Sequence, residues 1–175
     1  SISDNGKRKI LMDVFEQNNA GAIVEFGKND SLNVIIGSAI EGSRGLISVH
    51  DSLGNQGVVM AVDENDDGEI KIFSDGEQKV ILDVFSQNDA GGMLLTGKNG
   101  TSNVVAGSAN NGSNGIVQVY DTLDNVAVEI IANGTNNGEI TLHRLGKKRV
   151  QLDVFEDNDA GAMLLLGIND SVNVI

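Results

Sequence analysis

The sequence repeats itself at a fixed interval of 70 residues. The tripeptide Asp-Val-Phe occurs at residues 13–15, 83–85 and 153–155, and the residues that follow each copy are also related. A period that runs through a whole chain is typical of arrays and fibres, in which one structural unit is stacked on the next. The repeat therefore disfavours a fold built around a single globular centre.

A shorter period of 23 or 24 residues lies inside the long one. It is marked by a series of glycines: Gly21, Gly45, Gly68, Gly91, Gly115, Gly138 and Gly161. Apolar residues stand two and four positions after each glycine, and Glu25 is the exception. Apolar residues at a spacing of two are typical of a β-strand, because alternate side chains of a strand point to the same face. Each short repeat is therefore predicted to contain a strand that starts near its glycine.

A second apolar stretch begins thirteen residues after most of these glycines. At residues 58–62, 80–82 and 104–106 the stretch is apolar at consecutive positions. A strand that is covered on one side would alternate apolar and polar residues, so these strands need a partner surface on both faces. No stretch keeps the helical spacing i, i+3, i+4 and i+7 between turn signals. The second cover must therefore be another sheet, from the same chain or from an identical neighbour.

The composition provides little bulk for a wide core. The chain has 40% hydrophobic residues but only 3% aromatic ones, and it contains no Trp, Pro or Cys. Aromatic side chains usually supply much of the area that a compact domain buries. A recurring stripe of Val, Ile, Leu and Met suits a narrow, elongated β structure instead. Without cysteine, no disulfide framework is available.

Two all-β architectures satisfy these observations. The first is an elongated repetitive β-fibre, a parallel homotrimer built as a triple-stranded β-helix or a β-prism, with the apolar columns on its inner face. The second is a monomeric β-solenoid, in which one coil of about 23 residues is stacked on the next. A solenoid needs capped ends, whereas this chain begins and ends in the same phase of its repeat. We therefore favour the trimer.

The domain organisation follows from the repeat. Residues 1–175 are expected to form one shaft segment, cut from a longer fibre. The long repeats are predicted at residues 1–20 (partial), 21–90, 91–160 and 161–175 (partial), each built of the shorter submodules.

One pattern recurs most clearly at residues 68–72, 115–121 and 138–142: a glycine, apolar residues at alternate positions, a turn and a second strand. Over the full chain, this pattern resembles the shaft repeats of bacteriophage tail fibres and related bacterial adhesion fibres. Members of that family are generally parallel trimers that hold a receptor-binding tip away from the particle. The resemblance implies a structural spacer located outside the cell or on the virion surface. A cell-surface glycan or receptor would then be bound by a tip outside this sequence.

The alternative function is a surface adhesin or carbohydrate-binding module with the solenoid fold. The formal net charge of −13 argues against a nucleic-acid partner, because nucleic-acid binding needs a basic surface. No long apolar run is present, so membrane insertion is not expected. Basic residues gather at 7–9, 79 and 147–149, in the same turn of each long repeat. A solvated turn is favoured there over a ring that binds an anionic glycan.

Asp63, Asn65 and Asp67 are the best candidates for a metal site. With Gly68 in the sixth position they match the first half of a calcium loop, in which oxygen ligands alternate along the chain. The twelfth position, which should be a bidentate glutamate, is Ser74. A plain acidic turn is therefore favoured over calcium, and no other cofactor is predicted.

His50 and His143 stand in the same column, five residues after a glycine. Their parity is opposite to that of the apolar column, so a surface or inter-sheet histidine is favoured over a three-histidine metal ring. Asp13, Asp83 and Asp153 are each one long repeat apart and cannot cooperate within one chain. Because no nucleophile stands with a plausible base, no catalytic residue and no enzymatic activity are predicted.

Overall fold

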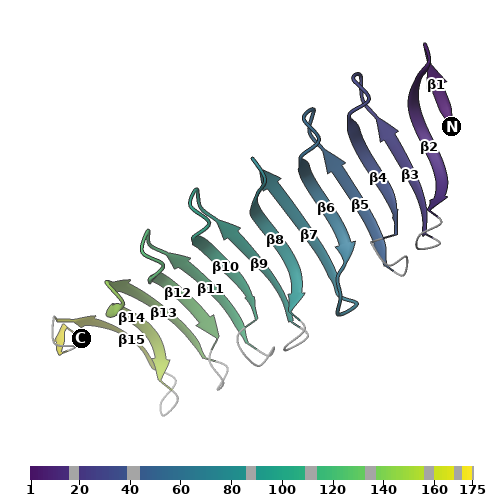
Figure 1. Cartoon of the computed structure of the whole chain (residues 1–175). Helices are drawn as coiled ribbons and strands as arrows, with labels where there is room; N and C mark the ends of the chain where they lie inside the picture. The colour runs from purple at the N-terminus through teal and green to yellow at the C-terminus, as the bar shows by residue number, and fades with distance from the viewer. Residues whose placement is uncertain are drawn as a thin grey trace. The chain divides into compact units, whose positions relative to one another are not determined.

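The computed structural model confirms the all-β prediction: the described residues form strands and turns (Figure 1). It describes residues 1–15, 20–38, 44–85, 90–108, 114–132, 137–155, 160–167 and 171–174. The chain divides into two compact units, Ser1–Ser86 and Gln87–Ile175. Each unit is considered by itself.

The first unit is an antiparallel sheet whose strands lie in sequence order. The strands are β1 (Ile2–Asp4), β2 (Lys7–Phe15), β3 (Ala20–Phe26), β4 (Leu32–Ser38), β5 (Gly45–His50), β6 (Gln56–Val62), β7 (Gly68–Ser74) and β8 (Glu77–Phe85). Each strand of this series pairs antiparallel with the next. The unit is therefore a meander of hairpins.

The second unit repeats this arrangement. Its strands are β9 (Ala90–Thr96), β10 (Ser102–Ser108), β11 (Gly115–Tyr120), β12 (Val126–Ala132), β13 (Gly138–Arg144), β14 (Lys147–Phe155), β15 (Ala160–Leu166) and β16 (Val172–Val174). Each strand here also pairs antiparallel with the next. A β-solenoid would pair the strands of successive coils in parallel. The solenoid alternative is therefore not the topology of either unit.

Two kinds of turn close the described hairpins. Asn5-Gly6, Asp75-Gly76 and Leu145-Gly146 have positive φ at both residues. This is the type I′ geometry, whose twist matches that of the flanking strands. The longer turns at 51–55 and 121–125 place one residue, Gly54 or Asp124, at positive φ. Glycine, asparagine and aspartate, which tolerate left-handed conformations, occupy most of these positions, and Leu145 is the exception.

Side chains alternate between two unlike faces of each sheet. On β3, Ala20, Ala22 and Val24 are buried, whereas Ile23 and Glu25 between and beside them are exposed. Residues directly opposite each other on neighbouring strands share a face, so the alternation extends across the sheet. We call the face that carries Ile23 the apolar face and the face that carries Val24 the mixed face.

The mixed face is the more enclosed one, although its buried side chains are small. The buried hydrophobic residues described are Ala20, Ala22, Val24, Val59 and Ala90, and the largest fully buried side chains are Thr141 and Ser48. The apolar column predicted to form an inner face lies on the other, open face, where Ile23 and Ile47 are each 39% exposed. Within the described residues, no second layer of this chain covers that column. The chain therefore leaves its most apolar surface uncovered.

Candidate functional site

The apolar face carries a continuous row of apolar side chains in each unit, and all of them except Ala106 are bulky. In the first unit the row consists of direct cross-strand partners from β2 to β8: Met12, Ile23, Ile36, Ile47, Met60, Ile70 and Leu82. In the second unit it runs from β9 to β15: Met93, Ala106, Val117, Ile130, Ile140, Leu152 and Met163. Because direct cross-strand partners have Cβ atoms about 4.5–5.5 Å apart, each row forms an unbroken apolar ridge. We call these rows the ridges.

The ridges are open to solvent. Met12 is 66% exposed, and Ile36, Met60 and Ile130 are each more than 40% exposed, at 46%, 44% and 47%. Single exposed apolar residues are common on any protein surface. A continuous row of them is a patch of the kind that marks an interaction surface.

A second row lies on the same face, two residues from the ridge. In the first unit it contains Ile10, Glu25, Val34, Val49, Val58, Ile72 and Val80. In the second unit it contains Leu95, Val104, Val119, Val128, Leu142, Val150 and Leu165. We call these the outer rows. The same position is thus apolar on every strand but one, and Glu25 interrupts the row.

A third row of small residues borders the ridge on its other side. Its members form cross-strand pairs with the repeat-marking glycines: Val14–Gly21, Ser38–Gly45, Val62–Gly68, Ser108–Gly115, Ala132–Gly138 and Val154–Gly161. We call this the small row. Among the three rows on the described strands, Glu25 is the one charged residue. The apolar face is therefore a bulky ridge beside a shallow depression.

Hollows occur where the ridge borders the small row. In the first unit a hollow of about 600 Å³ is lined by Met12, Asp13, Val14, Gly21, Ala22, Ile23 and Ile36. In the second unit an equivalent hollow of about 560 Å³ is lined by ten residues that include Leu152, Val154, Gly161 and Met163. These two sets are related by two long repeats. In both hollows the glycine leaves space that a side chain would otherwise fill.

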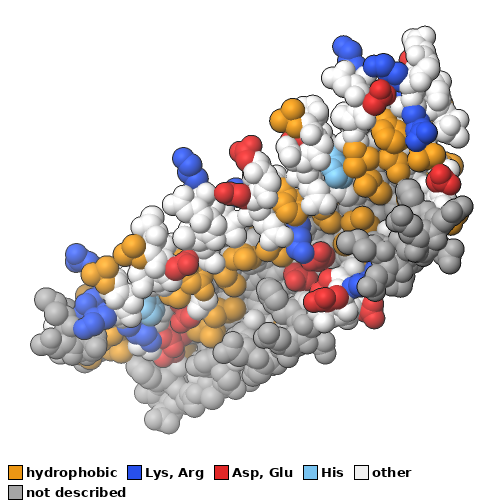
Figure 2. Space-filling model, viewed as in Figure 1, with side chains coloured by type: hydrophobic (Ala, Val, Ile, Leu, Met, Phe, Trp, Pro, Cys, Tyr) orange, Lys and Arg blue, Asp and Glu red, His pale blue; other side chains and the backbone are white. Residues whose placement is uncertain are grey.

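The mixed face carries polar groups that find partners within the chain. Figure 2 shows hydrophobic side chains there together with histidine and charged side chains. Gln118 Nε2 donates to Glu129 Oε1 at 2.6 Å, and Tyr120 donates to Gln118 Oε1 at 2.6 Å. Burial, with the nearby charges of Glu129 and Asp124, raises the pKa of Tyr120. In the first unit Lys71 and Glu69 form an ion pair at 2.5 Å.

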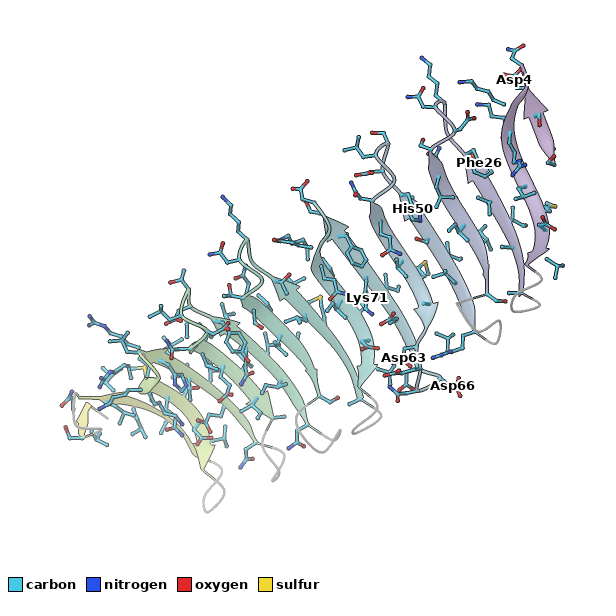
Figure 3. All side chains as sticks on the ribbon, in the orientation of Figure 1. Asp4, Phe26, His50, Asp63, Asp66 and Lys71 are labelled. Atoms are coloured by element: carbon cyan, nitrogen blue, oxygen red, sulfur yellow. The ribbon has the colours of Figure 1, made fainter. Side chains whose placement is uncertain are left out.

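The predicted calcium ligands lie in the turn between β6 and β7, where Figure 3 labels Asp63. Asp63 Oδ1 accepts the backbone N–H groups of Asn65 and Asp67 at 2.8 and 3.0 Å. The Asn65 side-chain amide donates to Asp63 Oδ2 at 3.2 Å. These bonds lower the pKa of Asp63, chiefly through the Asp67 amide. The carboxylate therefore closes the turn.

The same carboxylate arrangement occurs where no calcium pattern exists. Asp51 accepts the backbone N–H groups of Leu53 and Asn55, and Asp121 accepts those of Leu123 and Asn125. Within the described residues, no group of three His, Asp or Glu side chains is arranged to hold a metal ion. Calcium binding by Asp63, Asn65 and Asp67 stays a prediction. The closing of the turn by its own carboxylate is another explanation for the acidic residues at these positions.

The histidines lie on the mixed face, opposite in parity to the ridge. His50 Nδ1 is 3.1 Å from the Gly54 carbonyl oxygen, which can only accept, so this nitrogen donates. In the neutral ring Nε2 then accepts from the Ser48 hydroxyl, 2.9 Å away, and the equivalent contact joins Thr141 and His143 at 2.8 Å. Ser48 is 1% exposed, so its hydroxyl is unavailable to a substrate. Both histidines are thus engaged in the sheet.

The predicted basic clusters lie at the hairpins that begin β2, β8 and β14. Lys9 Nζ donates to the Gly27 carbonyl oxygen at 3.4 Å, and Arg149 donates to the equivalent Gly167 carbonyl. Lys79 pairs with Glu77 at 2.5 Å. Lys9 and Arg149 therefore each donate to a neighbouring turn, whereas the Lys79 ion pair lies within β8. The preference for a solvated turn over a glycan-binding ring stays a prediction.

The comparisons with family models and with curated proteins add no relative. Neither a scan of protein-family models nor a search of curated proteins finds a match to this chain. In the part of the chain that the structure describes, no helix is long and apolar enough to cross a membrane. The function must therefore be argued from the two faces of the sheet.

Proposed function

We propose that this chain is a structural segment of an extracellular or virion attachment fibre, where it serves as a shaft or spacer that holds a receptor-binding tip away from the particle or cell. The observation that carries the proposal is the ridge. The same apolar row is built strand after strand in each unit and remains open to solvent. A surface of this kind is suited to repeated contact between chains along an axis.

The chain is proposed to act as a parallel homotrimer. Within each unit the strands already pair with their neighbours along the chain. Copies would therefore associate as whole sheets, because the backbone hydrogen-bonding groups between strands are used. This supports a prism of three sheets over a triple-stranded β-helix in which strands from different chains alternate. A parallel arrangement places identical repeats of the copies side by side.

Native mass tests this proposal directly. Light scattering coupled to size-exclusion chromatography should give the mass of three 18.4 kDa chains, or 55.2 kDa. Far-UV circular dichroism of the same fraction should report β-sheet. A species of 18.4 kDa throughout the micromolar range would refute the trimer.

A further inference from the structure

We infer that the apolar face is the surface through which copies of this chain contact one another, with the mixed face turned outward. The inference rests on the proposed function for the existence of a self-associated state, and it adds which face of the sheet is buried. The occupant of the apolar face is a second copy of the same chain, and in a trimer a third.

The charge distribution favours a copy of the chain as the occupant. Each chain has a formal net charge of −13, so two copies repel wherever their acidic residues meet. The three rows of the apolar face carry a single charged residue, Glu25, on the described strands. Asp63 and Asp121 lie in turns, and Glu69 and Glu129 lie on the mixed face. Copies can thus approach through the apolar face without placing many like charges in contact.

The accessible surface area of the chain is larger than the area expected for a compact monomer of the same mass. The chain exposes 11321 Å² for a mass of 18.4 kDa. The scaling of surface with mass predicts about 8,200 Å² for a monomeric protein of this size, which leaves an excess of about 3,100 Å². Obligate interfaces bury about 2,000–5,000 Å² in total, which is shared between the two partners. A copy with two neighbours in a ring contributes half of two such interfaces, so it also buries about 2,000–5,000 Å². The excess is of the size that contacts with two further copies would bury.

The shape of the apolar face suits contact with itself. The bulky ridge stands beside the small row, and hollows of about 600 and 560 Å³ lie between them. For either unit taken by itself, a threefold axis along its ridge would place equivalent side chains of the three copies at one level. The ridge of one copy can then pack over the small row of the next, as large and small residues interdigitate in a packed core.

The mixed face is the weaker candidate for this contact. Several of its polar groups already have partners in the chain, such as Gln118 with Glu129 and Lys148 with Glu139, at 2.6 Å in each case, although among the described residues Asp83 Oδ1 is buried without a hydrogen-bond partner. Packing another sheet against these groups would remove them from water, and a buried ion pair rarely repays that cost. An outward position leaves the charged groups solvated.

One substitution pair separates this face from the rest of the surface. Ile47→Glu places a charge in the middle of the ridge, where Ile47 is 39% exposed. Leu53→Glu is the matched control, because it adds the same charge and removes an apolar side chain that is 85% exposed in a turn. We expect Ile47→Glu to weaken self-association by more than about a hundredfold, since three buried side chains per trimer are lost. Leu53→Glu should leave the native mass unchanged.

Spin labels decide the question without relying on that variant. The chain has no cysteine, so Ile47→Cys, Leu53→Cys and Lys71→Cys each offer one labelling site. Packed sheets lie about 10 Å apart, so labels at position 47 should show dipolar broadening between copies and restricted access to a water-soluble relaxing agent. Labels at position 53 in the turn and position 71 on the mixed face should stay accessible and free of broadening.

The outcomes distinguish this inference from the proposed function. A native trimer with broadening at position 47 and a monomeric Ile47→Glu variant supports both. A native trimer with an accessible label at position 47 and broadening at position 71 overturns the assignment of the face and leaves the fibre proposal standing. A native monomer overturns both.

Discussion

Replacing Gly37 with alanine tests the closest approach between strands on the mixed face. Gly37 on β4 lies opposite Ala22 on β3. A Cβ atom at Gly37 would stand 2.6 Å from the Ala22 Cβ and 2.7 Å from the Gly21 carbonyl oxygen. Neither atom belongs to a flexible side chain that can rotate away, so the two strands must move apart.

The magnitude follows from two opposing effects. Forcing extra atoms into a close-packed position costs about 1–3 kcal/mol. Restricting the unfolded chain by replacing glycine returns about 0.4–1 kcal/mol. Because two contacts fall below 3.0 Å and one involves backbone, we take the upper part of the first range and expect a net loss of about 2 kcal/mol in the free energy of unfolding.

Gly57→Ala is the control for this experiment. A Cβ at Gly57 would meet only the Val49 carbonyl oxygen, at an ordinary 3.6 Å, so the substitution should stabilise the chain by about 0.4–1 kcal/mol. Urea unfolding followed by circular dichroism, at one fixed chain concentration because association shifts the transition, measures both variants. A Gly37→Ala variant as stable as Gly57→Ala would show that the strands do not approach as described.

Four further predictions concern the turns and the apolar face. Leu145→Asn should raise the free energy of unfolding by about 1 kcal/mol, because asparagine tolerates a left-handed backbone better than leucine does. Leu145 has a φ of 52° and is 71% exposed. The control Leu145→Ala keeps the backbone strain and should change the free energy of unfolding little. Hydrogen bonds donated by the residue four positions later lower the pKa of Asp51, Asp63 and Asp121 below the ordinary 3.8. These carboxylates stabilise the fold above that pKa, and the stabilisation is lost as the pH falls through their lowered pKa values. The urea midpoint of the triple Asp→Asn variant should therefore fall less than that of the parent between about pH 5 and pH 2. Millimolar calcium should leave the urea midpoint of the parent unchanged, since the Asp63 carboxylate is engaged in its turn, and a rise that Asp63→Asn abolishes would instead establish a cation site. Glu25→Leu should strengthen self-association measured by sedimentation equilibrium, and Glu25→Gln should strengthen it less. Equal association constants for the parent and both variants would place position 25 outside the contact between copies.

The repeat-marking glycines show how much of the fold the sequence could predict. Strands β5, β7, β11 and β13 begin at the glycines of the shorter period, and β3, β9 and β15 begin one residue before theirs. The prediction succeeded because a spacing of two reports strand alternation directly. It could not show that Ile36 and Met60 on the intervening strands complete the same ridge. That depends on the pairing register, which turn length and bulges determine.

The candidate sites show the limits of spacing more sharply. Acidic residues at alternate positions are shared by a calcium loop and by a turn that is closed with its own carboxylate. The spacing cannot show that the first carboxylate points to backbone N–H groups, as Asp63 does. The close approach at Gly37 was also hidden, because its partner Ala22 is known only from the register. One signal was available, since Gly107 occupies the equivalent position in the next long repeat.

The spacing of the marking glycines also determines how this sheet can change in length. Each interval of 23 or 24 residues contains two strands, as between β3 and β5 or between β5 and β7. Removing or duplicating one interval keeps the strand direction and returns every ridge residue to the same face, whereas removing one strand would reverse the direction of all that follow. With strands about 4.8 Å apart, one interval changes the extent of a unit by about 10 Å. Evolution can therefore adjust the reach of such a segment in steps of one hairpin without redesigning either face.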